Sequence, residues 1–191
     1  MYKIVITGAP CTGKTEFIHW INNKCDNINC IPEVGSIIKE MGFPFDSAEE
    51  RLDFECKIYD FQILLENWMK EQLINKDAVL LCDRGSLDVF AYCDLCNVIS
   101  LDSQLEYEKY NAVLHFRCAT SLESYEELRY ENLYRDENYE RALELDKELA
   151  NLWKGHPAYY EIAWENNKYK KYENAFGIIS KILRRTERKE V

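Results

Sequence analysis

Long apolar runs are absent from this sequence of 191 residues. None approaches the roughly 20 residues that a helix needs to cross a bilayer. The sequence also lacks internal repeats, low-complexity segments and linker-like stretches, which excludes a repeat array and predicts one domain over residues 1–191. No segment with the features of a signal peptide precedes the first strand-like run. We therefore expect a cytoplasmic protein without membrane insertion.

Basic residues are in the minority, with 24 Lys and Arg against 34 Asp and Glu, and the net charge is −10. An acidic surface repels phosphate backbones, so extended nucleic-acid binding is disfavoured. Residues 168–191 are the exception, because they carry eight Lys or Arg against three Glu, a net charge of +5. A nucleic-acid partner is therefore an alternative that this stretch alone supports.

A second Cys-x-x-Cys pair is missing as well. Among the eight cysteines, Cys93 and Cys96 form the one close pair, which cannot complete a zinc site alone. Cys82 lies in an apolar run, where a small buried thiol packs well. We expect reduced, structural thiols, as is usual in the cytoplasm.

Short apolar segments alternate with helix-like segments, which is the pattern of a parallel sheet with helices on both faces. Strands are predicted at Tyr2–Thr7, Ile28–Pro32, Ala78–Cys82, Ala112–Cys118 and Tyr159–Trp164. Helices are predicted at Lys14–Lys24, Val34–Met41, Ser47–Lys76, Ser86–Cys96, within 123–154, and at Asn174–Arg185. The predicted fold class is α/β, with a parallel five-stranded sheet flanked by helices.

The longest predicted helix begins with a capping box, because Ser47 is followed three residues later by Glu50. Its apolar residues are spaced by three and four positions, which predicts a face that packs against the sheet. These residues are Phe54, Ile58, Phe61, Leu65 and Trp68.

The segment after the first predicted strand matches G-x-x-x-x-G-K-[ST] at every fixed position. In this motif the glycines let consecutive amides face phosphate oxygens, and the following helix adds a favourable dipole. Lys14 can reach the β- and γ-phosphates, and the Thr15 hydroxyl can bind Mg²⁺. The motif predicts a P-loop NTPase whose nucleotide-binding residues are Gly8, Ala9, Pro10, Cys11, Thr12, Gly13, Lys14 and Thr15.

An acid and an arginine follow the third predicted strand, where a parallel sheet presents its ligand-binding edge. Asp83 can hold Mg²⁺ or deprotonate an acceptor hydroxyl, and the sequence leaves these two roles open. Arg84 can clamp the acceptor or the transferred phosphate. A helix cap is the alternative explanation for Asp83.

Candidates for the acceptor side are fewer. Glu33 ends the second predicted strand, so it can bind an acceptor hydroxyl or ring nitrogen, or be a solvated residue at a helix start. Phe43 and Phe45 can stack on a ring, although core packing explains them more simply. His156 lies between Gly155 and Pro157, a combination typical of a helix end.

Three arginines lie in the polar helical stretch over 123–154, which is a candidate lid. Lid arginines neutralise the transferred phosphate and exclude water. Arg135 and Arg141 each follow a glutamate by four residues, so ordinary helix ion pairs account for both, and Arg129 is the third candidate.

Five segments together resemble one group of P-loop proteins. They are VITGAPCTGKT, IPEVGSIIKEMGFPF, LLCDRGSLDVFAY, YNAVLHF and ENLYRDENYERALELDKELANLWKGHP. The chain is similar to the AAA-type, kinase-like ATPase domains. These are related to the nicotinamide-riboside kinase domain of the bacterial NAD-biosynthesis regulator and to the nucleotide-binding domain of the animal light-channel translocation-defect proteins.

The resemblance implies an adenylate-kinase-like or nucleoside-kinase-like core with a helical lid. It implies that Asp83 and Arg84 lie near the acceptor, and that Arg135 is the lid arginine. An I-D-N segment that is frequent in these relatives is replaced here by Ile162-Ala163-Trp164-Glu165-Asn166, which weakens the prediction of base contacts there.

These observations predict an ATP-dependent phosphotransferase that uses Mg²⁺ and ATP, or GTP, to phosphorylate a small nucleoside- or nucleotide-like acceptor. Lys14, Asp83, Arg84 and Arg135 are its predicted catalytic residues, and Glu33 and Arg84 its predicted acceptor-binding residues. A GTP- or ATP-binding regulatory NTPase that acts through a protein partner is the alternative. The lack of a D-x-x-G motif disfavours a Ras-type switch and leaves an unconventional use of GTP open. A polynucleotide 5′-end kinase is the third hypothesis.

Overall fold

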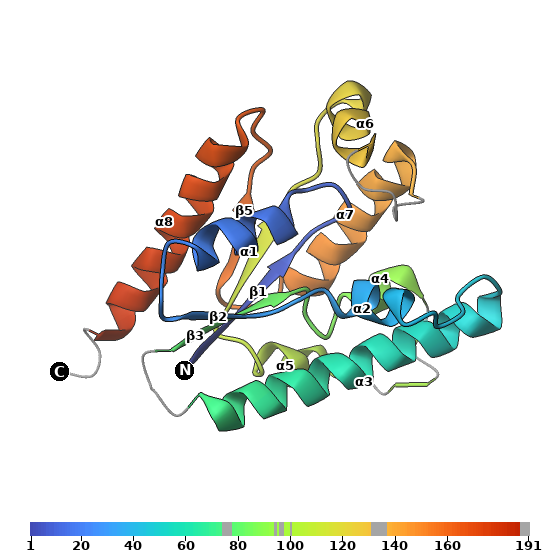
Figure 1. Ribbon diagram of the computed structural model, residues 1–191, viewed down its shortest axis with the longest axis horizontal. Coiled ribbons are helices and arrows are strands. Elements are labelled where there is room, and N and C mark those ends of the chain that lie inside the picture. The colour runs from blue at the N-terminus through green and yellow to red at the C-terminus, as the bar shows by residue number, and fades with distance from the viewer. Residues whose placement is uncertain (74–77, 94, 96–97, 100, 131–136, 188–191) are drawn as a thin grey trace.

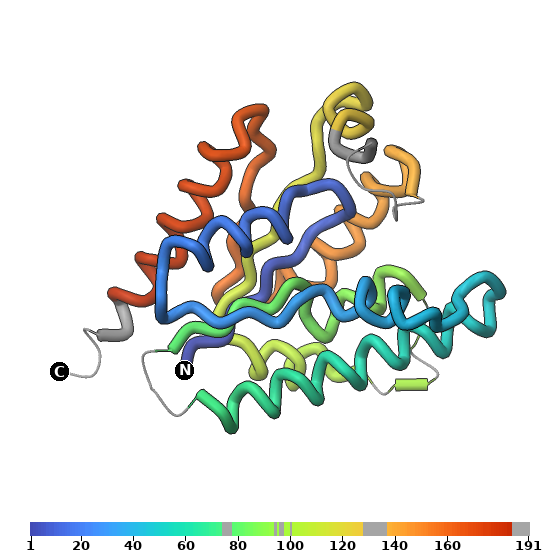
Figure 2. The backbone as a smooth tube through the Cα atoms, viewed as in Figure 1, coloured from blue at the N-terminus to red at the C-terminus, as the bar shows by residue number. Residues whose placement is uncertain are grey.

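In the computed structural model, five parallel strands form one sheet in the order β2-β3-β1-β4-β5 (Figure 1). All residues of β3 and β4 are buried, as expected for a sheet covered on both faces. This confirms the predicted α/β fold. The strands are β1 (Tyr2–Thr7), β2 (Ile28–Ile31), β3 (Val79–Asp83), β4 (Ala112–Phe116) and β5 (Tyr159–Ile162). The structure describes the chain except for residues 74–77, 94, 96–97, 100, 131–136 and 188–191 (Figure 2).

The central position of β1 decides where a ligand can bind. Its neighbours are β3 and β4, and its register pairs Ile6 with Asp83 and Thr7 with His115. The chain builds one side of the sheet with β2 and β3 and then the other with β4 and β5, so the strand order reverses at β1. Open α/β sheets bind ligands at the carboxyl edge beside such a reversal. The loop after β1 and Asp83 therefore share one edge.

Helices cover both faces of the sheet. On one face α1 (Lys14–Asn22) and α8 (Lys168–Glu187) pack against β1, β3 and β4 through a core that includes Phe17 and Ile179 (Figure 1). On the other face the core includes Trp153 of α7 and Phe54 of α3. The elements that contribute to this second side are α2 (Val34–Glu40), α3 (Ala48–Gln72), α4 (Val89–Tyr92), α5 (Ser103–Tyr107) and α7 (Tyr139–Trp153).

A third apolar cluster joins the carboxyl edge of the sheet to the region predicted as a lid. Tyr125 of α6 (Leu122–Tyr130) and Leu145 of α7 pack with Ala9 and Cys11 of the loop after β1. The stretch 123–154 thus forms two helices, with residues 131–136 between them outside the described part. Both helices contact the candidate phosphate loop directly.

Several predicted elements have different bounds in the structure. The helix predicted at Ser86–Cys96 is the short α4, because the preceding Asp88 uses its carboxylate to bind Thr7 and Trp153 and the backbone of Cys93 is extended. The helix α5 was not predicted; its Asp102 cap accepts hydrogen bonds from the amides of Gln104 and Leu105. The last helix begins at Lys168 rather than Asn174, and β5 ends at Ile162.

The capping box of the long helix α3 is confirmed, with Ser47 and Glu50 bonded reciprocally. The predicted packing face of this helix is wrong in part, because Phe61 and Trp68 are 40% and 56% exposed. Apart from Phe54, the buried residues of α3 are Glu55, Gln62 and Glu66. A polar stripe therefore faces the protein interior. Glu66 is stabilised there by Lys3, Gln62 and Tyr110.

Two further sequence-based expectations concern thiols and membranes. All seven cysteines in the described part of the chain are free thiols. Burial raises the pKa of Cys82 well above its ordinary value, which keeps this thiol protonated and unreactive. None of the described helices combines enough length and apolar character to cross a bilayer.

We predict that Gly85→Ala destabilises the fold by about 1–3 kcal/mol, because overpacking a filled core forces neighbouring groups to move. A Cβ atom at this position would lie 2.7 Å from Trp153 Cζ2 and 2.9 Å from Val5 Cγ2. Gly177→Ala is the matched control in α8, where nothing lies within 4 Å of the added atom. This control should stabilise the protein by about 0.5–1 kcal/mol. Urea unfolding of both variants measures the difference, and equal effects would contradict the packing argument.

Candidate functional site

The loop Gly8–Thr15 has the backbone of a phosphate-binding turn. Gly8, Cys11 and Gly13 have positive φ angles of 142°, 59° and 78°. At Gly8 a Cβ atom would lie 2.3 Å from the carbonyl oxygen of Phe116, so only glycine fits. Cys11 adopts the left-handed conformation without being glycine, a strain that residues at functional sites often carry.

Lys14 is buried and folds back over this loop. Its Nζ donates to the carbonyl oxygen of Ala9 at 2.8 Å and to Thr12 Oγ1 at 3.2 Å. The Thr12 hydroxyl donates to the same Ala9 oxygen at 2.9 Å. The ammonium group is thus held at the centre of the loop, where it can meet a phosphate oxygen with little movement.

Thr15 and Asp83 join the loop to the end of β3. The Thr15 hydroxyl donates to Asp83 Oδ2 at 2.7 Å. Asp83 is 1% exposed, and its Oδ1 has no hydrogen-bond partner among the described residues. Burial, and secondarily the charge of Glu33, raises the pKa of Asp83 to about 6. A buried carboxylate oxygen without a partner, beside a hydroxyl, is a suitable environment for a cation.

This pair fits Mg²⁺, which is held in proteins by one or two oxygen side chains together with phosphates and water. In the described part of the chain, no group of three or more His, Cys, Asp or Glu side chains is arranged to hold a metal ion. A Mg²⁺ ion at Thr15 and Asp83 would therefore take its other ligands from nucleotide and solvent.

Arg84 connects the loop to a second cavity. Its Nε donates to Glu33 Oε1 at 2.6 Å, and an Nη atom donates to the carbonyl oxygen of Gly8 at 3.4 Å. The backbone of Arg84 has a φ of 83°, and its carbonyl accepts a hydrogen bond from Gln62 of α3. The guanidinium also lies 5.2 Å from the centroid of the Tyr92 ring. Side chains from α2, α3 and α4 thus fix the arginine.

A cavity of about 550 Å³ opens beside Arg84, which is within the usual size range for small-molecule sites. Its walls come mainly from α2, α3 and α4 and from the beginning of α7. Glu33 and Arg84, the predicted acceptor-binding residues, line it. Phe43 and Phe45 both pack against the core, as expected, and Phe45 also lines the cavity. Asp83 is not among the lining residues; it faces Thr15 instead.

Glu55 also lines this cavity and was missed by sequence analysis. It is 8% exposed, and burial raises its pKa to about 7 in spite of the opposing charges of Arg84, Lys39 and Arg51. The available signal was the spacing of Glu55, Gln62 and Glu66, which places three polar residues on one face of α3.

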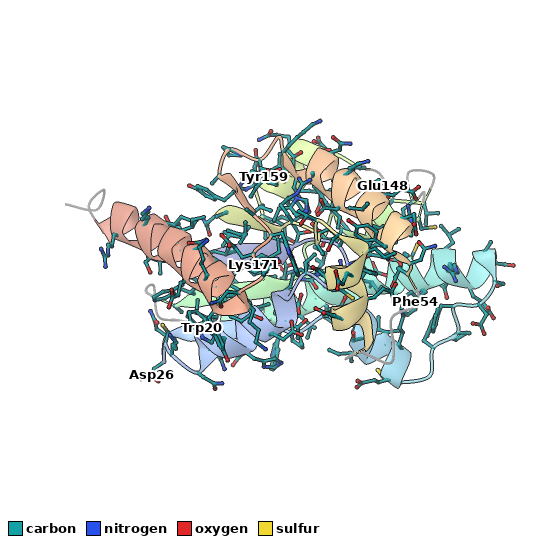
Figure 3. All side chains as sticks on the ribbon, turned by 90° about the horizontal axis from the view of Figure 1, so that it is seen from above. Trp20, Asp26, Phe54, Glu148, Tyr159 and Lys171 are labelled. Carbon is teal, nitrogen blue, oxygen red and sulfur yellow. The ribbon has the colours of Figure 1, made fainter. Side chains whose placement is uncertain are left out.

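A second cavity, of about 420 Å³, lies on the other side of the loop. It is lined by Thr12 and Gly13 together with Trp164, Asn166 and Tyr172 from the region around the start of α8. Figure 3 labels one residue beside each cavity, Lys171 beside this one and Phe54 beside the first.

Lys171 is a second cation at the phosphate loop that the sequence did not reveal. Its Nζ donates to the carbonyl oxygens of Thr12 at 3.0 Å and Arg117 at 3.3 Å. It lies 4.6 Å from the centroid of the Trp164 ring. Burial, with a smaller contribution from the charge of Lys14, lowers the pKa of Lys171 to about 7. The side chain fastens α8 to the loop.

The remaining predicted residues divide into two groups. Arg135 lies outside the described residues, as does the side chain of Arg129. Arg141 lines the first cavity and pairs with Glu144 and Glu148. Its predicted helical pair with Glu137 is wrong, because α7 begins at Tyr139 and Glu137 precedes the helix.

His156 is buried in a structural position. Its Nε2 is 3.1 Å from the carbonyl oxygen of Tyr110, and its Nδ1 accepts a hydrogen bond from the amide of Ala158. It joins the end of α7 to the start of β5, which agrees with the helix-end interpretation.

The sheet order, the glycine loop and the acid after β3 together define a P-loop domain of kinase-like architecture. A family model described as an AAA domain, AAA_28, matches residues 3–170. The chain belongs to this AAA domain family, which confirms the resemblance seen in the motifs.

Solved structures agree with this assignment. A deoxyadenosine kinase from M. mycoides with products dCMP and a flexible dCDP bound is similar, with a TM-score of 0.62 and 14% identity over 94% of this chain and 99% of that one. A structure of deoxyadenosine kinase from M. mycoides with bound dATP has a TM-score of 0.53 and 15% identity over 93% and 99%. At such identities the likeness shows the fold alone. No curated protein matches the sequence.

We predict that Lys171→Met weakens nucleotide binding about threefold to tenfold, because the variant loses a buried hydrogen bond to the loop backbone that is worth about 0.5–1.5 kcal/mol. Lys170→Met is the matched control, since Lys170 is exposed and pairs with Glu165. Calorimetric titration of ATP and GTP in magnesium buffer tests the pair. Equal affinities of the two variants would contradict a role of α8 in shaping the loop.

We predict that Glu55→Gln stabilises the protein at about pH 8 by about 1–3 kcal/mol. The folded-state pKa of about 7 lies above the ordinary 4.5. The folded protein therefore holds an extra proton between these values, and stability is lost as pH rises through this window. Glu55→Gln removes the titrating group and with it this loss of stability. The stability gained by the variant should therefore be smaller at about pH 5 than at about pH 8. Urea unfolding at both pH values measures it, and a gain independent of pH would contradict this account.

Proposed function

We propose that this protein is a phosphotransferase that moves the γ-phosphoryl group of ATP or GTP to a hydroxyl of a nucleoside-sized small molecule. The observation that carries this proposal is Arg84, which contacts the phosphate loop at Gly8 and also Glu33 in a separate cavity of about 550 Å³. A cavity of that size, next to the loop but distinct from the nucleotide side, suits a second substrate. A regulatory NTPase does not require one.

The donor side of the proposed site is the P-loop and the cavity of about 420 Å³. Loop amides and Lys14 would bind the triphosphate, and the base would lie near Trp164 and Tyr172, which line that cavity. Thr15 and Asp83 would hold Mg²⁺, which when bound neutralises charge on the β- and γ-phosphates. The hydrogen bond from Thr15 to Asp83 supports this role for Asp83 over that of a base.

On the acceptor side, Glu33 would bind the attacking hydroxyl and take its proton, because it lines the cavity and Asp83 does not. Arg84 would neutralise the transferred phosphoryl group with its planar fork. The ion pair between them orients both groups. Positioning and electrostatics then account for most of the acceleration.

Arg135 remains our proposed lid arginine. The contacts of Arg141 with Glu144, Glu148 and the carbonyl oxygen of Ala91 occupy that residue, which supports the choice of another arginine for the transferred phosphate. Residues of α6 and α7, among them Tyr125 and Leu145, share one apolar cluster with Ala9 and Cys11 of the loop.

Contacts of the basic C-terminal stretch favour a small acceptor over a polynucleotide end. Lys170 pairs with Glu165, and Lys171 is buried against the loop. Both cations therefore serve internal contacts, and the overall net charge of −10 opposes binding of a phosphate backbone.

Transfer of label from γ-labelled ATP and GTP to nucleosides, nucleotides, pyridine ribosides and 5′-OH oligonucleotides tests the proposal. We expect Glu33→Gln to lower kcat about 10²- to 10⁴-fold with little change in nucleotide affinity, as for loss of a general base. Asp83→Asn should weaken binding of nucleotide in magnesium buffer by about 10- to 100-fold. Glu40→Gln, an exposed residue that lines the same cavity, is the control.

Three outcomes would contradict this assignment. Slow hydrolysis with every acceptor would favour the regulatory NTPase. Transfer to oligonucleotides alone would favour the 5′-end kinase. Nucleotide binding unchanged by Lys14→Ala would remove the P-loop argument itself.

A further inference from the structure

The cavity beside Arg84 contains a buried carboxyl group that the proposed chemistry does not use. Glu55 is 8% exposed and lines this cavity. Within the part of the chain that the structure describes, it has no hydrogen bond and no ion pair. The Tyr92 hydroxyl, on the same cavity, also lacks a partner among the described residues. Buried polar groups are normally paired, so the unpaired Tyr92 hydroxyl beside the Glu55 carboxylate in one cavity points to a ligand.

Other buried acids of the protein show what a satisfied carboxylate looks like here. Glu66 accepts hydrogen bonds from Lys3, Gln62 and Tyr110. Asp146 is bonded to the His115 ring, Arg117 and the amide of Cys118. Glu55 has no equivalent of these contacts, although burial has raised its pKa to about 7. A buried carboxyl group that has no hydrogen bond to any described residue is best explained by a ligand that it binds.

The surroundings of Glu55 limit what that ligand can be. Phe45 and Phe54, with ring centroids 5.4 Å apart, line the same cavity and suit a flat ring. The cavity carries charges of both signs, which suits a ligand that has hydrogen-bond donors and acceptors but no net charge. Its basic lining residues are Lys39, Arg51, Arg84 and Arg141, and its acidic ones are Glu33, Glu40, Glu55, Asp88 and Glu137. A neutral flat ring with polar edges fits both features.

Hydrogen-bond chemistry narrows the choice further. An ionised carboxylate only accepts hydrogen bonds, and its two oxygens match two adjacent donors. Among neutral nitrogen heterocycles, a ring N–H next to an exocyclic amino group presents this pair. The carbonyl on the other side of that N–H accepts a hydrogen bond, and Lys39 and Arg51 can supply donors.

We propose that Glu55 determines acceptor specificity by binding the N–H and amino group of a guanine-like ring, a 2-amino-6-oxopurine or a heterocycle with the same edge. This inference rests on the proposed function and names the substrate class of its acceptor cavity. The hydroxyl to be phosphorylated would then lie at the other end of the acceptor, beside Glu33 and Arg84. The guanine-like edge would be selected at the end of the cavity bounded by Phe45 and Phe54.

Guanosine and inosine provide the sharpest test, because they differ only in the amino group. Without that group one oxygen of Glu55 stays unpaired, so we expect kcat/KM with guanosine to exceed that with inosine about tenfold or more. Adenosine, which offers a ring acceptor in place of the N–H, should be used no better than inosine. The assays use γ-labelled ATP, the full chain and about pH 8, where the carboxyl is ionised.

Glu55→Gln separates recognition from a structural role. The glutamine side chain offers one acceptor, its carbonyl oxygen, where the carboxylate offers two. Its NH2 group would face one of the two guanine donors, the ring N–H or the amino group, and repel it. We expect this variant to lose about tenfold or more with guanosine and to change less than about threefold with inosine. Glu71→Gln, exposed near the other end of the same helix, should leave both substrates unchanged. Equal use of the three nucleosides, or an equal loss with all of them in Glu55→Gln, would overturn the inference.

Calorimetric binding of guanosine and inosine in the presence of a non-hydrolysable ATP analogue distinguishes this inference from the proposed function. Preferential guanosine binding that Glu55→Gln abolishes, without label transfer, would support the recognition and overturn the phosphotransferase. Label transfer to some nucleoside without any dependence on Glu55 would do the reverse. Absence of both transfer and Glu55-dependent binding would overturn both.

Discussion

The hydrogen bond between Thr15 and Asp83 is the contact on which the site depends. It joins the first residues of α1 to the last residue of β3, and it exists because β1 and β3 are parallel neighbours in register. Lys14 directly precedes Thr15 in the sequence, and Arg84 directly follows Asp83. The loop between β1 and α1 cannot move relative to β3 without breaking a buried contact of Asp83.

The polar inner face of α3 has a different purpose from the apolar faces that hold the sheet. Glu66 anchors the helix through Lys3 and Tyr110, and Gln62 bonds the backbone of Arg84, which is held at a positive φ. Along the same face Glu55 reaches the cavity. Gln62, in the middle of α3, therefore holds the backbone of Arg84, and Glu55, nearer the start of the helix, presents a titratable carboxyl group to the cavity. Such an arrangement sacrifices some stability for a pre-shaped binding surface.

Sequence analysis succeeded where a local pattern has one physical meaning. A glycine loop after a buried strand defines a P-loop, and alternating strands and helices define the sheet, so both were predicted. The role of α3 was misjudged because its apolar spacing suggested a packing face, whereas Phe61 and Trp68 are exposed and the buried residues are polar. Lys171 could not be identified, because it meets Thr12 across 159 residues of chain, a separation that no local pattern encodes. Asp83 was ambiguous for a similar reason, since its contact with Thr15 joins residues 68 positions apart in the chain.

The position of Lys171 bears on how the domain should be delimited. The family match ends at residue 170, immediately before this lysine. Yet α8 packs against α1 and β5, and its second turn supplies the side chain that braces the carbonyl of Thr12. A shortened protein that ended at residue 170 would keep every residue of the nucleotide motif. It would lose the hydrogen bond from Lys171 to the carbonyl oxygen of Thr12. The packed domain therefore extends beyond the residues that the family match covers.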